Sequence, residues 1–460
     1  MAKLVALAAY LYQAVLAFGL LIVLSHLLPP GEYAAYSLFA SIAQFGAIAF
    51  FEWVRFACSR FYPGPDGASE ASERGTITAE FVASAVACVV AGLFATIWGA
   101  PLWVGLAGAG AAVLIAAGEL HLTMLRFRLA FGLFSRLQGV RASLLAAATV
   151  GGAFISADFA HVVLGILFGN VLYCLIAFAA ARQVLGWSVR ADLGAVRRHL
   201  AYGGVSAGAS VAGLLGPLGL KAILVAAFGA TPAAGALLAL DLLQRPFILI
   251  VSSLQAIRYP DLVALYDRSG AGDALKQELG RYYALLACLT LIGGALLLAV
   301  MEWAAGFVVP RDLQGAFLRT APAFTVMALI RALVQTLLPT PAHLLRRLRA
   351  IAGLAALDCV LMCAGAFIAM GLLPGSDTAI ALGAAAGAGL AMLAGLPLLR
   401  LLPFAMPWRP VALAGAALLA ALLIKIGLSG NVLLSTAVAL AAVLSLGAAP
   451  ALAAFRWAAR

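Results

Sequence analysis

Long apolar runs separated by short gaps constrain this chain more than any other sequence feature. A membrane span needs roughly 20 mostly apolar residues to cross about 30 Å of hydrocarbon. Residues 4–28, 36–56 and 78–98 are the first three such runs, and the series continues to 432–449. Counting them gives about fourteen along the chain. The sequence therefore predicts an all-α, polytopic membrane protein with about 14 transmembrane helices.

Basic residues occupy every second gap between these runs, and this predicts the orientation of the spans. The basic gaps contain Arg55, Arg60 and Arg74; Arg126 and Arg128; Arg182, Arg190, Arg197 and Arg198; Arg258, Arg268, Lys276 and Arg281; Arg346, Arg347 and Arg349; Arg400 and Arg409; and Arg456 and Arg460. The other gaps contain Glu32, Asp158, Asp377 and a mixed loop with Glu302, Arg311 and Asp312. Because Lys and Arg are retained in the cytoplasm, both termini are predicted to be cytoplasmic and the number of spans to be even.

Composition excludes several classes of protein. Charged residues make up 10% of the chain, whereas a soluble protein has about 25%. The net charge of +11 is spread over the basic gaps, where it suits anionic lipid headgroups and offers no soluble domain for nucleic acid. The six cysteines have neither a disulfide framework nor zinc-ligand spacing, and no motif indicates a metal or a cofactor.

An internal repeat predicts two similar lobes. HLLPPGEYAAYSLFASIAQF, residues 26–45, resembles AAFGATPAAGALLALDLLQR, residues 226–245, and the following spans end in RFYP at 60–63 and RYP at 258–260. Proline disfavours helix in the residue before it, so both ends are natural helix termini. About six spans separate the copies, so the repeats are parallel and related by an axis along the membrane normal.

The repeat sets the predicted domain boundaries. They are an N-terminal lobe of six spans at 1–185, a cytoplasmic amphipathic linker at 186–200, a C-terminal lobe of six spans at 201–400, and two appended spans with a cytoplasmic tail at 401–460. In the linker, apolar residues from Trp187 to Leu200 can share one side, opposite Arg190, Arg197 and Arg198. This pattern is typical of a helix that lies on the membrane interface.

Charged residues inside the spans are the candidate site. A charge at bilayer depth costs at least about 2.5–3.5 kcal/mol, so it needs a partner or a wet cavity. The predicted cavity residues are Lys221, Asp241, Arg245, Arg331, Arg55 and Glu52. Guanidinium and ammonium groups bind phosphate and carboxylate oxygens, which favours a polar, anionic cargo. Asp241 and Asp358 are the candidate titrating groups if transport is coupled to an ion.

Other interpretations of these charges stay open. Arg55 and Lys425 are close enough to span ends to extend their charged groups to the interface. Asp241 and Arg245 are four residues apart and share a helix face, so they could form a private ion pair. Lys221 and Arg331 have no carboxylate within their own spans, which favours a water-filled lumen around them.

The first sixty residues resemble Wzx-type polysaccharide flippases of the MOP (multidrug/oligosaccharidyl-lipid/polysaccharide) superfamily. The resemblance lies in HLLPPGEYAAYSL and in RFACSRFYPG, and Ala34 stands where that family often has glycine. The resemblance implies a MATE-like fold and a flippase of the bacterial inner membrane that moves undecaprenyl-pyrophosphate-linked oligosaccharide by alternating access. It implies surface polysaccharide (exopolysaccharide, O-antigen or capsule) as the product. The implied partners are membrane lipids, a polysaccharide polymerase and chain-length proteins, with no nucleic acid and no cofactor.

Two other classes remain as alternatives. The first is a drug or metabolite antiporter of the same superfamily, which should have unpaired carboxylates at mid-membrane. The second is a membrane-embedded polymerase or ligase of the same glycan pathway, but the outer gaps are short and show no nucleophile–base pair. The sequence therefore favours a transporter over an enzyme.

Overall fold

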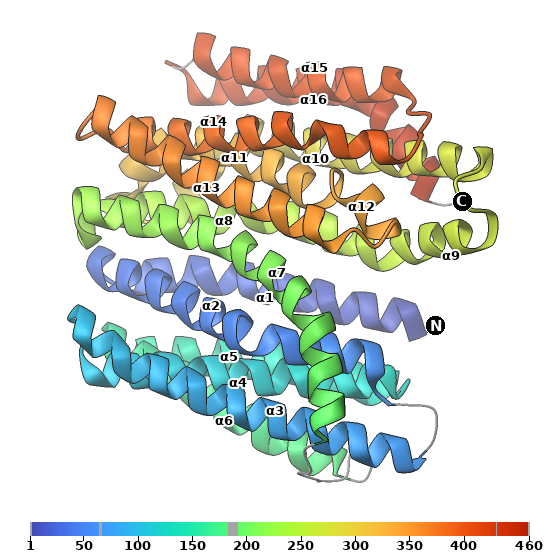
Figure 1. The fold of residues 1–460 in the computed structure, drawn as a ribbon. Helices are drawn as coiled ribbons and strands as arrows, with labels where there is room; N and C mark the ends of the chain where they lie inside the picture. The colour runs from blue at the N-terminus through green and yellow to red at the C-terminus, as the bar shows by residue number, and fades with distance from the viewer. Residues whose placement is uncertain (1, 64–66, 183–191, 429, 459–460) are drawn as a thin grey trace. The chain divides into compact units, whose positions relative to one another are not determined.

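The computed structural model describes residues 2–63, 67–182, 192–428 and 430–458. All regular elements within these ranges are helices, drawn in Figure 1. Among the described residues, thirteen helices are long and apolar enough to cross a membrane, and α1 adds an apolar stretch over Leu11–Leu27. The prediction of an all-α, multi-pass membrane protein with about 14 spans is confirmed.

The chain divides into two compact units, Met1–Leu218 and Gly219–Arg460. The first unit contains α1 (Ala2–Leu27), α2 (Pro30–Phe61), α3 (Gly67–Phe94), a short 3-10 helix (Ala95–Trp98), α4 (Leu102–Phe127), α5 (Phe131–Ile155), α6 (Phe159–Ala181) and most of α7 (Leu193–Phe228). Residues 193–200 are the first turns of α7. The described part of the predicted 186–200 linker is therefore continuous with a span instead of a separate helix. The rest of the linker, 186–191 with Trp187, lies outside the described residues.

The second unit begins inside α7, so this one helix runs from the first unit into the second. Its further elements are α8 (Ala230–Ile257), α9 (Tyr259–Ser269), α10 (Asp273–Val308), α11 (Arg311–Thr336), α12 (Thr340–Leu344), α13 (Leu348–Leu372), α14 (Asp377–Gly395), a 3-10 helix (Leu396–Leu401), α15 (Trp408–Gly427) and α16 (Val432–Ala458).

Both copies of the sequence repeat form a helix, a tight turn and a second helix. In the first copy, α1 ends at Leu27 and α2 begins at Pro30, where a proline costs no helical hydrogen bond. In the second copy, Gly229 makes the turn with φ +83°, a conformation that glycine adopts without steric cost. The predicted exits also hold, because α2 ends at Phe61 and α8 ends at Ile257.

Small residues let α13 and α14 pack closely. A Cβ added to Gly383 would lie 2.3 Å from the Gly365 carbonyl oxygen, and one added to Gly387 would lie 2.1 Å from the Leu361 oxygen. Without Cβ atoms the two backbones can approach each other, as in other membrane helix pairs. Gly383 and Gly387 are therefore positions of close helix contact.

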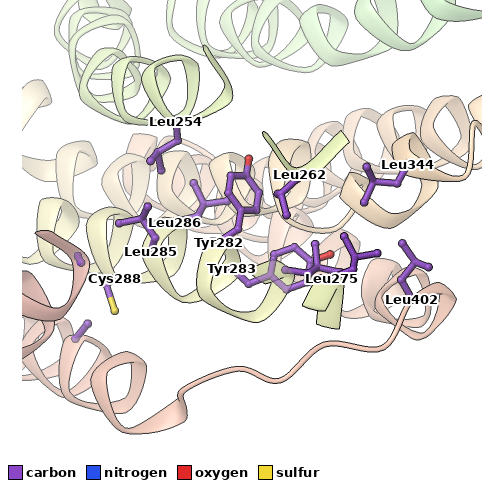
Figure 2. Close-up of a cluster of buried hydrophobic side chains, with 13 residues drawn as sticks. Leu254, Leu262, Leu275, Tyr282, Tyr283, Leu285, Leu286, Cys288, Leu344 and Leu402 are labelled. Carbon is purple, nitrogen blue, oxygen red and sulfur yellow. The ribbon is translucent and has the colours of Figure 1, made fainter. Parts of the chain in front are cut away.

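The two helices after residue 401 belong to the core of the second unit. α15 and α16 pack against α10 and against each other. In the N-terminal half of α10, Tyr282 and Tyr283 belong to a buried cluster (Figure 2). Its other members include Leu262 of α9, Leu344 of α12 and Leu402. The backbone N–H of Ala405 donates to the Lys276 carbonyl at 2.9 Å, so the segment that leads into α15 is fixed to α10.

Candidate functional site

A buried ion pair joins α7 to α8 in the second unit. Lys221 is 4% exposed, and its Nζ lies 2.6 Å from Oδ1 of Asp241. A paired charge avoids much of the cost of an isolated charge at membrane depth. The structure thus brings together two of the predicted site residues, Lys221 and Asp241, which the sequence had not paired.

Arg245 lies one turn beyond Asp241 on α8, and its side chain is exposed. The sequence left open a private ion pair between Asp241 and Arg245, but the partner that the structure gives Asp241 is Lys221. Spacing along one helix shows only which residues share a face, and the neighbouring helix supplies the competing cation. Arg245 is therefore an exposed guanidinium on a helix that carries a buried ion pair.

A second buried pair joins α11 to α13. Arg331 is 5% exposed and Asp358 is 1% exposed, with 3.1 Å between Nε and Oδ2. The other carboxylate oxygen of Asp358 has no hydrogen-bond partner among the described residues. Arg331 was expected to face a water-filled lumen, and the structure instead packs it inside the unit against Asp358. The sequence placed Asp358 inside a span but offered no reason to pair it with a residue 27 positions away.

α7, which carries Lys221, approaches α13, which carries Asp358. A Cβ added to Gly219 would lie 2.9 Å from Sγ of Cys363, so α7 comes close to α13 at this glycine. Gly219 lies two residues before Lys221, and Cys363 lies five residues after Asp358.

In the first unit, Glu52 and Arg55 border a small polar cavity. Nε of Arg55 donates to Oε2 of Glu52 at 2.8 Å, and the Glu52 side chain is buried. The cavity has a volume of about 130 Å³, and Gln44 and Glu119 also line it. Arg55 is thus paired within its own helix, while 40% of its side chain is exposed.

Sequence analysis missed Arg141, the partner of Glu119. Arg141 lies on α5, 7% exposed, with Nη1 2.5 Å from Oε1 of Glu119 on α4. Its guanidinium also lies over the Tyr173 ring of α6, 5.8 Å from the ring centroid. The signal was available, because Arg141 immediately precedes the apolar run ASLLAAATV. Glu119 thus takes part in a contact between α4 and α5.

Carboxylates compensate most of the predicted cationic site. Lys221, Arg331 and Arg55 each pair with an acidic side chain, while Arg245 remains exposed. Lys425, expected to reach the interface, donates to Oε2 of Glu302 at 2.9 Å. Among the described residues, the predicted cavity residues are therefore polar more than cationic. Binding of a substrate by these six residues stays a prediction.

Comparisons with solved structures identify the fold. The lipid II flippase MurJ, in an inward closed conformation, matches with a TM-score of 0.74 and 11% identity, over 95% of this chain and 97% of that chain. An inward-facing multidrug resistance MATE family transporter of the MOP superfamily matches with a TM-score of 0.69 and 13% identity, over 87% and 98%. A MOP superfamily transporter from Pyrococcus furiosus matches with a TM-score of 0.59 and 12% identity, over 87% and 95%.

At the level of sequence, no protein-family model and no curated protein matches this chain. At identities of 11–13% the likeness shows the fold, and it confirms the MATE-like architecture expected from the resemblance. The chain is therefore a multi-pass membrane protein with the fold of the MurJ flippase and of MATE transporters.

Proposed function

We propose that this protein is a flippase that moves undecaprenyl-pyrophosphate-linked oligosaccharide repeat units across the bacterial inner membrane for surface polysaccharide synthesis. One observation carries the proposal: nearly the whole chain shares its fold with a lipid II flippase, over 95% of its length. The flippase-like HLLPPGEYAAYSL and RFYP motifs in the same chain support it. Alternating access is the mechanism that this fold supports.

The extent of the chain favours a flippase over a drug transporter. The MurJ structure covers 95% of this chain, whereas the MATE transporter covers 87%. Beyond the predicted two lobes this chain has α15 and α16, which are fixed to α10 by a shared core. The larger share of this chain that matches MurJ therefore supports a carrier of a lipid-linked cargo.

The polar groups of the described residues suit a sugar-phosphate headgroup. Gln44, Glu52 and Arg55 offer amide, carboxylate and guanidinium groups, which together donate to and accept from sugar hydroxyls. The exposed Arg245 offers a fork of donors that matches phosphate oxygens. In the proposed cycle the groups of each unit contact the headgroup in their own right, while the lipid tail stays in the bilayer.

A deletion strain tests the proposal. We expect surface polysaccharide to be lost and complete repeat units on undecaprenyl pyrophosphate to accumulate in the membrane. Unchanged glycan together with altered sensitivity to cationic compounds would instead establish the second candidate, a drug or metabolite antiporter, which the likeness to the MATE transporter supports. Loss of glycan with full-length polymer retained inside the cell would place the defect after translocation and contradict the proposal.

Point variants in the complemented strain test the site. Arg245→Ala should reduce surface glycan without lowering the amount of protein, because Arg245 has an exposed side chain that no core contact requires. Lys221→Ala should also reduce it, with a smaller amount of protein, because Asp241 would lose its buried partner. Arg268→Ala, an exposed arginine on α9, is the charge-matched control. Normal glycan from both site variants would refute the assignment of Lys221 and Arg245.

A further inference from the structure

A fully buried histidine in the first unit lies between two carboxylates. His199, near the start of α7, is 0% exposed. Its Nδ1 lies 2.9 Å and 3.1 Å from the two carboxylate oxygens of Glu80, and its Nε2 lies 3.0 Å from Oε2 of Glu73. Both glutamates belong to α3 and are seven residues apart, so two helical turns place them on one face. The imidazole therefore bridges α3 and α7.

The geometry requires a bound proton. A neutral imidazole has one N–H, so it can donate to one carboxylate and must accept at its other nitrogen. Two arrangements satisfy both contacts: an imidazolium between two carboxylates, or a neutral imidazole between one carboxylate and one carboxylic acid. Both arrangements contain the same number of protons. This number is one more than in a neutral imidazole between two carboxylates. These heavy-atom distances thus fit the proton-loaded form of this cluster.

The loaded cluster is electrically balanced. Nη2 of Arg198 lies 3.0 Å from the other oxygen of Glu73, so two negative charges meet a guanidinium and the shared proton. The Phe61 ring of α2 stacks on the imidazole with 5.0 Å between centroids. Loss of the proton would leave an uncompensated negative charge beside a 0% exposed ring, and an unpaired buried charge is costly.

A water-accessible cavity reaches the cluster from one side. It has a volume of about 660 Å³, and Glu73 and Arg198 line it together with Arg60, Tyr62, Ser72 and Asp192. The side chain of Glu80 is 2% exposed and that of Glu73 is 12% exposed, so Glu73 is the open end. Among the described residues, the charged groups that face the cluster or line this cavity are Arg60 from α2, the two glutamates from α3, Asp192 just before α7, and Arg198 and His199 from the start of α7.

We propose that Glu73, His199 and Glu80 form a proton-binding site that couples transport to the proton gradient. The inference rests on the proposed transport function and names its coupling ion. In the unloading step one N–H bond of the imidazolium breaks, Glu73 takes the proton and passes it to water in the cavity, and the imidazole keeps its second N–H. The group then carries one more negative charge, and an imidazole lone pair faces a carboxylate oxygen about 3 Å away. The contact between α3 and α7 weakens accordingly.

α7 carries this change to the candidate substrate site. His199 and Lys221 lie on one helix, Leu193–Phe228, with Pro217 between them. In the proposed coupling, proton loss near the start of this helix acts through it on the Lys221–Asp241 pair. Near the cluster, α7 also touches α2, because a Cβ at Gly203 would lie 2.3 Å from the Trp53 carbonyl oxygen. Asp241 and Asp358, the titrating candidates drawn from the sequence, are both held in ion pairs. In the His199 cluster, by contrast, two carboxylates contact one imidazole, so a shared proton can bind there.

Histidine NMR measures the shared proton directly. The protein has five histidines, so the full-length chain labelled with ¹⁵N-histidine in lipid nanodiscs gives few ring signals, and the signal lost in His199→Gln is assigned to His199. We expect a doubly protonated ring that loses one proton in a single step as the pH is raised from about 5 to well above the ordinary range of an imidazole. Glu80→Gln should abolish or shift this step, and Glu278→Gln, a glutamate in the Arg258 ion pair of α10, should leave it unchanged. A His199 signal that keeps one protonation state throughout this range overturns the proposal.

Hydrogen exchange of the same samples tests the coupling to α7. After correction for the intrinsic effect of pH, the amides at the start of α7 should lose protection at the midpoint seen by NMR. Glu73→Gln, at the open end of the cluster, is a second variant that retains the Glu80 contact and should shift the midpoint. Proton loss without a change in the protection of α7 would make the cluster a structural ion network and overturn the coupling.

The cellular readout separates this inference from the proposed function. Glu80→Gln should lose surface glycan at normal protein level, and Glu278→Gln should keep it. If the deletion strain retains its glycan while the NMR and exchange transitions occur as expected, the flippase function fails and the proton site stands. If the deletion strain loses its glycan while Glu80→Gln exports normally, the flippase function stands and the proton site fails.

Discussion

The Arg331–Asp358 pair offers the sharpest test of how this fold holds charge inside a membrane. Both side chains are almost completely buried, with Nε 3.1 Å from Oδ2. Replacing Asp358 with leucine leaves the guanidinium of Arg331 buried without its carboxylate. Replacing both residues, as Arg331→Met with Asp358→Leu, removes both charges and nearly preserves volume. The single and double variants therefore separate the cost of an unpaired charge from the value of the pair.

The expected magnitudes follow from the geometry. At 3.1 Å and an effective dielectric constant of about 20, the attraction is about 5 kcal/mol. Desolvation of both ions offsets much of it, so apolar replacement of a whole buried pair is often neutral or stabilising. Removal of one partner of a buried pair costs about 3–5 kcal/mol. Asp358→Leu should therefore destabilise the protein strongly, and the double variant should recover most of the loss.

Thermal unfolding in detergent, followed with a thiol-reactive dye, can measure the difference. Cys58, Cys88 and Cys288 are buried, free thiols, so the native chain reports its own unfolding. Arg319→Met is the matched control, because Arg319 pairs with Asp377 while 59% of its side chain is exposed, and such pairs contribute about 0–1 kcal/mol. Equal destabilisation in the single and double variants would refute the reasoning. It would show that the shapes of Arg331 and Asp358, not their charges, stabilise the site.

Three further predictions use other parts of the structure. Gly383→Leu should prevent α13 from packing on α14 and abolish the folded protein in detergent, since its Cβ would lie 2.3 Å from the Gly365 oxygen, while Gly389→Leu, which meets nothing within 4 Å, should remain folded in size-exclusion chromatography. Asp158 caps α6, and hydrogen bonds from Ser156 and His161 lower its pKa below the ordinary 3.8. The cap is therefore fully present above that ordinary pKa and is lost as the pH falls through the lower folded pKa, so hydrogen exchange at the start of α6 should be insensitive to acid until well below neutrality, and early loss of protection would contradict it. A C-terminal green fluorescent protein fusion should fluoresce and a C-terminal alkaline phosphatase fusion should be inactive if the C-terminus is cytoplasmic, and the opposite pattern would reverse the predicted topology.

Local sequence signals account for most of the architecture. Apolar length indicated the spans, and prolines and glycines marked their ends, as at Pro30 and Gly229. These predictions succeeded because the hydrocarbon of a bilayer offers no hydrogen-bond partners. A spanning segment must therefore form its backbone hydrogen bonds within a helix. The linker predicted at 186–200 is different in the structure: its described residues 193–200 are the beginning of α7. An amphipathic pattern alone does not show where a helix ends, and here α7 continues through Gly203 and Gly204.

The sequence by itself determined that the chain crosses a membrane many times, and that Lys221, Asp241, Arg331 and Asp358 lie within spans. Tertiary structure alone decided their partners: Lys221 with Asp241, Arg331 with Asp358, Arg141 with Glu119, and His199 with Glu73 and Glu80. The physical reason is that helical spacing relates residues three or four positions apart, whereas these partners lie on different helices. Their pairing depends on how each helix is rotated about its axis, and the packing of the whole unit sets that rotation.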